Sequence, residues 1–557
     1  MGKREDIWQD IKETSQVPVL IVGGGINGIG LFRELALQGV DCLLVDKSDF
    51  VAGASSKSSR MIHGGLRYLE NGEFKLVKES LRERNLLLEN AAHYVSPLKT
   101  TIPLFSWFAG LVKSPLVLMR LPVKPGGRGA LVAKMGLWFY DFVTRKNRRT
   151  PRHFLTSKRD SLREIPGLNP GVVATVTYWD AWVTQAERMC LEMIHDARAG
   201  NPNCRALNYV SVAGAEGETV RLENAANGEC VLVTPQIVVN ATGAWVDHAN
   251  AALGLKTRFM GPTKGSHLVV DCPALYEALG DRMVYYEHQD GRVCIVFRFM
   301  DKVIMGSTDI RVDDPDSVTC SEDEIAYMMT TLRGVFPELE ISRDQIVYKY
   351  CGVRPLPLAE DDVTSKISRD HSIETIEPDE NRAFPVLCLV GGKLTTFRAL
   401  AEQAADQVLL RLGVKRTCST EHVPIGGGRG FPADETEAAA WIARVSSESG
   451  LDRDRVAVLL CRYGTSAEEY TRHADPNAEA SLKSLPDYTV GEIEHLVAHD
   501  YVEHLTDLIC RRSLIALLGQ ASADALAELA EIVGNCLDWD PTRREREIAL
   551  ALTEVQT

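Results

Sequence analysis

Apolar and polar positions near the N-terminus follow the order strand, helix, strand. Residues 17–22 form a short apolar run rich in β-branched side chains, and residues 41–45 form a second one. Between them, over about 26–38, apolar positions recur with helical spacing and stop at Gly39. A continuous apolar run is typical of a parallel strand that is buried on both faces. The pattern therefore predicts two parallel strands joined by a helix.

The turn between the first predicted strand and the helix carries the pattern G-x-G-x-x-G at Gly23, Gly25 and Gly28. The first glycine permits a tight turn, the second lets backbone approach a pyrophosphate, and the third lets the helix lie close to the strand. The helix N-terminus adds N–H groups and a positive dipole. Asp46 ends the second strand, where its carboxylate can accept hydrogen bonds from a ribose. We therefore predict a dinucleotide-binding fold rather than a simple glycine turn.

Two later strands return the chain to this fold. The apolar run 235–240 leads into Ala241-Thr242-Gly243, and the run 386–390 leads into Gly391-Gly392 and a helix through Leu412. Between them, residues 255–370 have a mainly β pattern. A chain that leaves the cofactor fold and comes back favours FAD over NAD as the dinucleotide.

The C-terminal part changes to helical periodicity after the glycine-rich stretch 426–430. Periodic segments lie near 435–447, 452–463, 490–509 and 521–533. We predict an α/β protein with a Rossmann-like FAD-binding domain of the glutathione-reductase or D-amino-acid-oxidase type, a mainly β substrate domain and an α-helical C-terminal cap. The expected divisions are a surface tail at 1–16, an oxidoreductase region at 17–425 (FAD-binding parts about 17–100, 171–250 and 350–412; substrate domain about 255–350) and a helical domain at 431–557.

Composition limits the possible functions. The formal net charge of −14 argues against a general nucleic-acid binder. The 13 cysteines include no C-x-x-C pair and no Cys/His zinc spacing, so we expect reduced, buried thiols, an intracellular location and no metal site. No secretory h-region and no long uncharged apolar stretch is present, which predicts neither a signal peptide nor a transmembrane helix.

Residues 100–153 differ from the rest of this acidic chain. Short aromatic and apolar patches, such as 104–108 and 136–140, alternate with basic residues and end in the basic run 145–149. This mixture suits contact with a membrane surface better than a membrane span. A core segment with a solvated basic face is an equally good interpretation.

Several polar residues are candidates for ligand contacts. Four serines lie beside two cations at 55–60, just before His63-Gly64-Gly65, and could bind phosphate and ribityl hydroxyls. His267 could act as a general base, since imidazole titrates near neutral pH. Arg354 lies between Gly352 and Pro355 and could bind an anionic substrate.

Together these motifs resemble the family of FAD-dependent, quinone-linked glycerol-3-phosphate dehydrogenases among the D-amino-acid-oxidase-like flavoproteins. The resemblance covers nearly the whole chain in the right order. The matching runs are 23–28, 55–69, 240–243, 264–267, 352–356, 391–396, 462–464 and 496–512. The most family-specific are 63–68 and 391–396.

The resemblance implies roles for individual residues. FAD would contact Gly23, Gly25, Asn27, Gly28, Asp46, Ser55, Ser56, Ser59, His63, Gly64, Gly65, Leu66, Ala241, Thr242, Gly243, Gly352, Gly392, Lys393, Leu394 and Thr395. The catalytic and substrate-binding residues would be Arg67, His267, Arg354, Lys393 and Thr395.

The implied reaction is oxidation of sn-glycerol 3-phosphate to dihydroxyacetone phosphate, with electrons passed through flavin to a quinone. The implied place is the cytoplasm, peripheral on the inner face of the cytoplasmic membrane, and a homodimer is one option. Some positions depart from the family's pattern and bear on the exact substrate or acceptor. They are Asp46 in place of Glu, the stretch 178–187 without paired acids and arginine after Trp182, Arg298 and Phe299, and Asp370-His371 in place of Asp-Tyr.

Three alternatives stay open at the level of sequence. One is a glycerophosphate oxidase that uses O₂, although the insertion typical of such oxidases is not apparent here. The second is an amine or amino-acid oxidase of the same fold group. The third is a non-catalytic flavin-binding or membrane-scaffold protein.

Overall fold

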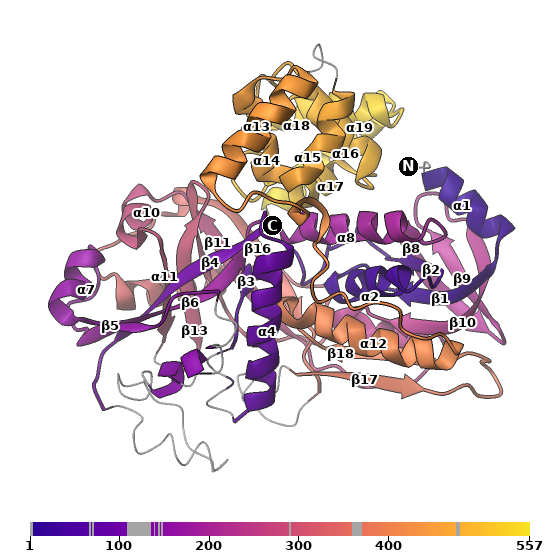
Figure 1. Ribbon diagram of the computed structural model, residues 1–557, viewed down its shortest axis with the longest axis horizontal. Coiled ribbons are helices and arrows are strands. Elements are labelled where there is room, and N and C mark those ends of the chain that lie inside the picture. Colours follow the sequence, from indigo (N-terminus) through magenta and orange to yellow (C-terminus); the bar gives the residue numbers. More distant parts are fainter. Residues whose placement is uncertain are drawn as a thin grey trace.

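The computed structural model describes residues 4–65, 68, 72–108, 135–138, 140–142, 145, 149–288, 291–358, 370–474 and 479–556. Two large sheets lie side by side, and a group of C-terminal helices covers their junction (Figure 1). The predicted fold class, α/β with a helical C-terminal part, is confirmed.

The first sheet contains the predicted dinucleotide-binding strands. Its order is β17-β18-β10-β1-β2-β7, with β8 and β9 attached to β10. The strands β18, β10, β1, β2 and β7 are parallel, and β17 is antiparallel to β18. The strand bounds are β1 Gln16–Val22, β2 Cys42–Val45, β7 Arg205–Leu207, β8 Val210–Glu216, β9 Thr219–Asn224, β10 Cys230–Asn240, β17 His371–Ile376 and β18 Val386–Gly391.

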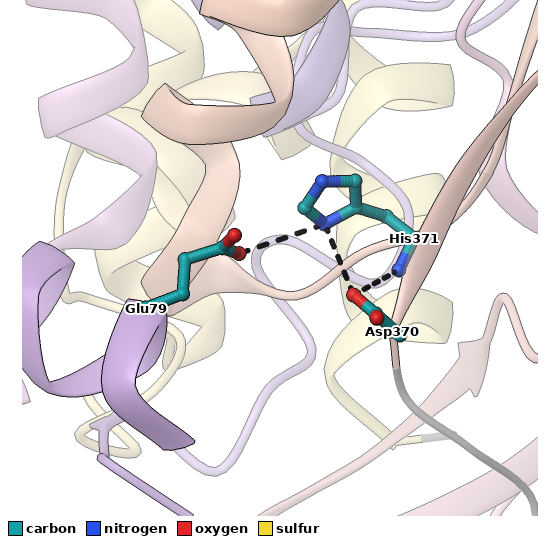
Figure 2. A group of neighbouring side chains, drawn as sticks. All are labelled: Glu79, Asp370 and His371. Carbon is teal, nitrogen blue, oxygen red and sulfur yellow. Dashed lines mark hydrogen bonds and ion pairs between the residues drawn. The ribbon is translucent and has the colours of Figure 1, made fainter. Parts of the chain in front are cut away.

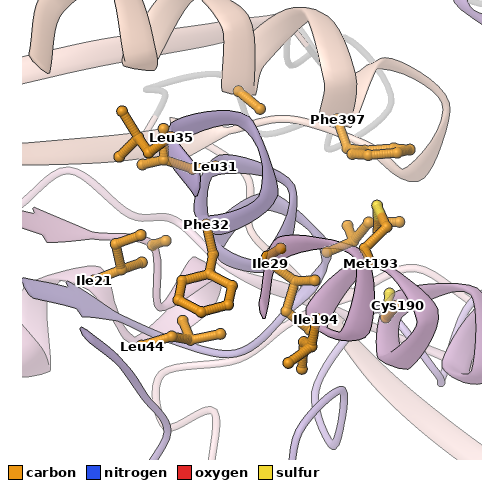
Figure 3. Packing of buried hydrophobic residues seen from close by; sticks show 14 of the residues in the cluster. Ile21, Ile29, Leu31, Phe32, Leu35, Leu44, Cys190, Met193, Ile194 and Phe397 are labelled. Carbon is orange, nitrogen blue, oxygen red and sulfur yellow. The ribbon is translucent and has the colours of Figure 1, made fainter. Parts of the chain in front are cut away.

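Strand β1 lies at the centre of this sheet and is buried on both faces. Val19 and Ile21 belong to a core beneath three helices, whereas Leu20 and Val22 belong to a core on the opposite face. The three helices are α2 (Ile26–Leu37), α8 (Ala186–Gly200) and α12 (Phe397–Leu412). Figure 3 shows side chains of α2, α8 and α12 packed together with Ile21 and Leu44 of the sheet. This packing fixes the glycine turn at the carboxyl end of β1.

The second sheet holds the predicted substrate domain together with earlier strands. Its order is β15-β11-β14-β13-β12-β4-β6-β3, with β16 paired to β11 and β5 paired to β6. The strand bounds are β3 Met61–Ile62, β4 Val95–Leu104, β5 Phe154–Ser157, β6 Ala174–Val183, β11 Thr263–Val270, β12 Arg282–Glu287, β13 Val293–Phe299, β14 Lys302–Gly306, β15 Ile310–Arg311 and β16 Ile346–Arg354.

The remaining helices of these two parts cover sheet edges and faces. They are α4 (Phe74–Asn90), α7 (Lys158–Glu164), α9 (Val246–Ala252), α10 (Pro273–Leu279) and α11 (Glu322–Val335). The helix α11 begins at a capping box, in which the Ser321 side chain accepts from the Glu324 N–H. Helix α4 connects the glycine-rich segment after β3 to β4 and passes the edge of the first sheet (Figure 1).

The C-terminal helices form a separate layer, at the top of Figure 1. Their bounds are α13 Glu435–Ser449, α14 Arg453–Tyr463, α15 Ala467–His473, α16 Val490–His499, α17 Leu505–Asp507, α18 Ala523–Cys536 and α19 Pro541–Gln556. The prediction of one helix over 490–509 is wrong. The helix ends at His499, and the carboxylate of the next residue, Asp500, contacts Arg188 and His195 of α8.

The N-terminal segment is also different from the prediction. Instead of a surface tail, residues 4–13 form helix α1 (Arg4–Glu13). Its apolar side chains Ile7, Trp8 and Ile11 are buried in the core on one face of the first sheet. The sequence shows the short apolar pattern, but the strands that α1 packs against, β7 and β10, are about 200 residues away in the chain.

Most of the segment predicted to face a membrane, 100–153, lies outside the described residues. The described part contains the end of β4 and several aromatic side chains at 105–108 and 135–142. Over the residues that the structure describes, no helix is long and apolar enough to cross a membrane.

Candidate active site

A cavity of about 1100 Å³ lies where the two sheets meet. Its walls come from the carboxyl ends of β1, β10 and β18 in the first sheet, and from β11 and β16 in the second. Ligands of open parallel sheets bind at this end of the strands, where the loops diverge. The cavity therefore joins the predicted cofactor fold to the predicted substrate domain.

The glycine turn at one end of the cavity allows very close packing. A Cβ at Gly28 would lie 1.9 Å from the backbone oxygen of Gly23, and a Cβ at Gly23 would lie 2.7 Å from backbone atoms of Ala241. Gly23 also has φ of 110°, which L side chains rarely adopt. Both glycines are therefore required for helix α2 to begin next to β1 and β10.

The first turn of α2 opens toward the cavity. Gly25 is its N-cap and has no side chain to fill the space, while Ser55 Oγ accepts a hydrogen bond from the Ile26 N–H at 3.0 Å. A helix N-terminus that faces a cavity is suited to a pyrophosphate, because its N–H groups and dipole favour negative charge.

Asp46 lies at the carboxyl end of β2 beside this turn. Its carboxylate accepts hydrogen bonds from the N–H groups of Gly24 at 2.6 Å and Ser48 at 2.8 Å. Burial raises the pKa of Asp46 to about 6, although the two backbone hydrogen bonds act in the opposite direction. The narrow glycine turn, the open helix end and this acid on the cavity wall fit the pyrophosphate and ribose of FAD.

The serine-rich segment and the strand β11 meet at His267. Its Nε2 forms a hydrogen bond with Ser59 Oγ at 2.8 Å, and its ring stacks on Tyr350 with centroids 4.9 Å apart. A Cβ at Gly306 would lie 2.4 Å from the imidazole, so only glycine leaves room for the ring. The pKa of His267 falls to about 3, mainly through burial and also through the charges of Arg354 and Arg60. His267 is therefore neutral at physiological pH, unlike the near-neutral titration expected from sequence.

Arg354 lies next to His267 at the end of β16. Its guanidinium donates to Asp309 Oδ1 at 3.1 Å, Ser307 Oγ at 2.9 Å and the Lys264 backbone oxygen at 3.2 Å. It lies over Gly265, where a Cβ would be 2.1 Å from Nη2. These contacts fix the guanidinium at the cavity wall.

The turn after β18 contributes Lys393 and Thr395. Lys393 Nζ donates to Ser80 Oγ of α4 at 2.5 Å and lies 4.4 Å from the centre of the Tyr68 ring. Thr395 Oγ1 accepts from the His63 N–H at 3.2 Å. The two most family-specific runs of the sequence, 63–68 and 391–396, are therefore in direct contact.

Most of the predicted site residues surround this one cavity. Those on its wall are Gly23, Gly25, Asn27, Asp46, Ser55, Ser59, His63, Gly65, Ala241, Thr242, Gly243, His267, Gly352, Arg354, Gly392, Lys393, Leu394 and Thr395. Gly28, Ser56 and Gly64 lie just behind the wall. Leu66 and Arg67, and with them a predicted substrate contact, lie outside the described residues. The roles of all these residues stay predictions.

Comparison with known proteins then identifies the family. The family model described as FAD dependent oxidoreductase matches residues 18–407, and the model described as C-terminal domain of alpha-glycerophosphate oxidase matches residues 418–544. A glycerol-3-phosphate dehydrogenase from Synechocystis sp. (strain ATCC 27184 / PCC 6803 / Kazusa) is 32% identical over 564 residues, which cover 95% of this chain and 94% of that protein. This chain belongs to the family of FAD-dependent glycerol-3-phosphate dehydrogenases.

The chain is also similar to a dehydrogenase of another sugar-alcohol phosphate and to a solved structure. A D-erythritol 1-phosphate dehydrogenase from Brucella abortus (strain 2308) is 29% identical over 518 residues, with 90% of this chain and 95% of that protein covered. The solved structure of a glycerol-3-phosphate dehydrogenase from Bacillus halodurans complexed with FAD has a TM-score of 0.75 at 23% identity, and covers 100% of this chain and 97% of that chain. Its likeness concerns the fold. The predicted family and the predicted cofactor, FAD, are confirmed.

One buried acid on the wall of the dehydrogenase cavity is not indicated by the sequence. Asp180 of β6 lines the cavity, accepts from the Gly64 N–H at 3.0 Å, and contacts Arg84 of α4 at 3.2 Å. Tyr140 donates to the same carboxylate. The pattern of residues 178–187 does not indicate a role for Asp180, because its partners come from distant segments.

The remaining departures from the family pattern lie in different places. Arg298 is not on the cavity wall, and its guanidinium lies over the Tyr276 ring, 3.9 Å from the ring centre. Asp370 and His371 are not on the wall either. Of the departures, Asp46 is the one whose predicted site role agrees with its position on the wall.

Proposed function

We propose that this family member oxidises sn-glycerol 3-phosphate at C2 to dihydroxyacetone phosphate and passes the electrons to a quinone. The observation that carries the proposal is the arrangement on one cavity of the FAD-type glycine turn, the cations Arg354 and Lys393, and the neutral imidazole of His267. The dehydrogenase relative from Synechocystis supports the choice of substrate.

The chain's own residues would bind and orient the substrate. Arg354 presents a planar guanidinium that suits a phosphate or a developing oxyanion, and Lys393 provides a second positive charge. His267, being neutral, can accept a hydrogen bond from the C2 hydroxyl at Nε2, in place of the hydrogen bond that this nitrogen forms with Ser59. FAD, when bound, supplies the redox chemistry by accepting hydride from C2.

A second candidate substrate has a specific observation in its favour. The D-erythritol 1-phosphate dehydrogenase is nearly as similar to this chain as the Synechocystis protein is. Both substrates carry a phosphate and a secondary hydroxyl, so the same cations would serve either one. The two substrates differ in chain length, and therefore in the room that each needs beside the flavin.

The test is an anaerobic visible spectrum of the purified holoenzyme, titrated with glycerol 3-phosphate or D-erythritol 1-phosphate. We expect glycerol 3-phosphate to bleach the flavin band at lower concentration, and a quinone analogue to restore it. If only D-erythritol 1-phosphate, an amine or an amino acid bleaches the band, the proposed substrate is wrong. If air restores the band as fast as the quinone analogue, the oxidase alternative replaces the quinone-linked one.

We also propose peripheral contact with the inner face of the cytoplasmic membrane. Support comes from aromatic side chains on either side of residues 109–134, of which Phe108 and Trp138 are 74% and 66% exposed. Exposed aromatic side chains beside basic residues bind the interface of anionic bilayers. The proposal predicts salt-sensitive co-sedimentation with phosphatidylglycerol vesicles, weakened in Trp138→Ala.

Vesicle binding needs a control variant, and the oligomeric state needs a measurement of its own. Leu410→Ala removes an equally exposed apolar side chain on α12 and should leave vesicle binding unchanged. Absence of vesicle binding at both low and high salt would overturn the membrane proposal. A homodimer is checked by sedimentation velocity of the holoenzyme.

A further inference from the structure

A group of three metal-ligating side chains lies outside the cavity. Glu79 of α4, Asp370 and His371 each place one ligand atom within 4.8 Å of the other two (Figure 2). The residues come from segments almost 300 positions apart in the chain, so no spacing in the sequence indicates them. Figure 2 shows the two carboxylates directed toward the same nitrogen of the imidazole.

The imidazole is held in an orientation that suits a metal ligand. His371 Nε2 forms a hydrogen bond with the Gln403 amide oxygen at 3.2 Å, and this acceptor requires the proton on Nε2. Nδ1 is then the ring nitrogen that faces the two carboxylates. In metal sites, the ring nitrogen that does not bind the metal usually donates a hydrogen bond to an oxygen, and this bond fixes the orientation of the imidazole.

Nδ1 of His371 lacks a hydrogen-bond partner although it is buried. The side chain is 5% exposed, and its Nδ1 forms no hydrogen bond with any described residue. It faces Glu79 Oε1 and Asp370 Oδ1, each at 3.9 Å, beyond the range of a hydrogen bond. At this separation a proton on Nδ1 would reach neither oxygen, whereas a cation between the three atoms could contact all of them.

We infer that Glu79, Asp370 and His371 bind a divalent transition-metal ion of the Zn²⁺ type. Two of the three separations are 3.9 Å and the third is at most 4.8 Å, so a point equidistant from the three atoms lies roughly 2.5 Å or less from each, near the roughly 2.0–2.2 Å that Zn²⁺ keeps to nitrogen and oxygen ligands. One imidazole with two carboxylates suits Zn²⁺ better than the all-oxygen sites of Ca²⁺ or Mg²⁺. The Asp370 side chain is 52% exposed, which leaves a side open for water as a fourth ligand.

The three side chains come from α4 and from the start of β17, and both elements lie next to the turn that carries Lys393. Glu79 precedes Ser80, whose hydroxyl accepts from Lys393 Nζ, and His371 pairs with Gly391 in the β17–β18 ladder. A metal ion at this point would join α4 to β17 on both sides of the Lys393 turn. Bound metal should therefore stabilise the fold around that turn without taking part in the reaction.

The test measures Zn²⁺ on the holoenzyme, prepared without a polyhistidine tag and stripped with EDTA. After dialysis against micromolar ZnCl₂ we expect one retained Zn²⁺ per chain, by elemental analysis, and a higher melting temperature with Zn²⁺ than with EDTA. His371→Tyr, which restores the tyrosine expected from the family pattern, should weaken Zn²⁺ binding at least tenfold and abolish the temperature shift. Glu79→Gln should weaken binding in the same direction while leaving the fold intact.

The matched control is His422→Gln, since His422 also pairs with a glutamate, Glu89 at 3.4 Å, but is 67% exposed and, among the residues that the structure describes, belongs to no such group. It should bind Zn²⁺ like the unaltered protein. Retention of less than one Zn²⁺ per chain, or equal retention in His371→Tyr and the unaltered protein, would overturn the inference. These outcomes are independent of which substrate bleaches the flavin.

Discussion

At the scale of single residues, two neighbouring side chains on the cavity wall differ in charge. His267 is 2% exposed, and burial and two nearby arginines keep it uncharged. Arg354 is 21% exposed and is charged, as guanidinium groups are in proteins; it pairs with Asp309 at 3.1 Å and donates to three further oxygens. A neutral acceptor next to a fixed cation suits a hydroxyl that loses its proton as it is oxidised.

Because the pKa of His267 is about 3, this residue should not titrate in the pH range in which kcat/KM is usually measured. The pH dependence of kcat/KM reports groups of the free enzyme, so His267 should contribute no inflection between pH 5 and 9. An inflection from the substrate phosphate should be the same in the unaltered enzyme and in His267→Gln. We expect the two profiles to be parallel, with the variant lower throughout. An inflection near pH 6.5 that disappears in His267→Gln would contradict the prediction.

The pKa of His267 also affects acid stability. Because the folded-state pKa lies below the unfolded value of roughly 6.5, the unfolded chain binds the proton more tightly. Stability from the neutral His267 is therefore complete above about pH 6.5 and falls as the pH drops toward 3. In His267→Gln this part of the acid destabilisation should be absent in thermal melts between pH 4 and 7.

Removal of the Arg354 guanidinium should affect catalysis rather than cofactor binding. Arg354→Ala should lower kcat/KM by roughly 100-fold or more, as for the loss of one charged donor at a developing oxyanion, with the flavin spectrum retained. Arg354→Lys should recover only part of the activity, because an ammonium lacks the planar fork. The exposed Arg411→Ala is the control. Unchanged turnover in Arg354→Ala would remove this residue from the site.

At the scale of elements, the site depends on how closely helix α2 approaches β1. The helix begins at Ile26 directly after the glycine turn, and its packing against α8 and α12 determines where its first turn points. Phe397 of α12 leaves no space for a Cβ at Gly30, which would lie 2.8 Å from its ring. Gly28 lets α2 approach the turn after β1, and Gly30 lets it approach α12, so these two glycines determine where the predicted phosphate-binding turn lies.

Two helical glycines give a matched test of this arrangement. In Gly28→Ala the new Cβ would lie 1.9 Å from the Gly23 oxygen, so α2 must shift and FAD should be lost or bound at least tenfold more weakly. In Gly334→Ala, on α11, nothing lies within 4 Å of the new Cβ, and the helix should gain up to about 1 kcal/mol. The measurement is the FAD content after gel filtration. Equal FAD content in both variants would contradict the proposed role of the turn.

At the scale of the whole molecule, the C-terminal helices are attached to the FAD-binding part through buried charges. Asp49, just after β2, contacts Arg511 and Arg512, and also accepts from Asn208 at 2.9 Å. The side chains of Asp49 and Arg512 are 1% and 0% exposed. Burial alone would raise the pKa of Asp49, but the two arginines more than offset this and hold the pKa well below its usual value.

Removal of this buried charge should destabilise the whole molecule. Asp49→Asn leaves the buried Arg512 without its anion and Arg511 with Asp507 alone, which costs about 3–5 kcal/mol of stability in comparable cases. Urea unfolding followed by flavin fluorescence should show the loss. Asp406→Asn, which removes an acid that is 59% exposed, should show little change.

The sign of the pH effect provides a second check on Asp49. A depressed pKa means that the stabilisation is present above the unfolded pKa of roughly 4 and is lost as the pH falls. The difference in stability between the unaltered protein and Asp49→Asn should therefore shrink below about pH 4. A difference that is the same at pH 3.5 and pH 7 would contradict the ion-pair account.

The sequence by itself determined the local elements and most of the site. Continuous apolar runs require burial on both faces, and Gly23, Gly25 and Gly28 permit a backbone geometry that few other residues allow. Because these causes act within a few residues, the sequence predicts the strand β1, the helix α2 and the acid at Asp46. The family resemblance added the residues of the turns at 63–65 and 391–395.

Only the tertiary structure decided which distant residues meet and what charge they carry. The neutrality of His267 depends on Tyr350, Arg354 and Arg60, and the burial of α1 depends on strands about 200 residues away. The group of Glu79, Asp370 and His371 likewise exists only because α4 passes the edge of β17. Burial and electrostatic fields arise from the sum of all neighbours in space, and one-dimensional spacing does not contain that sum.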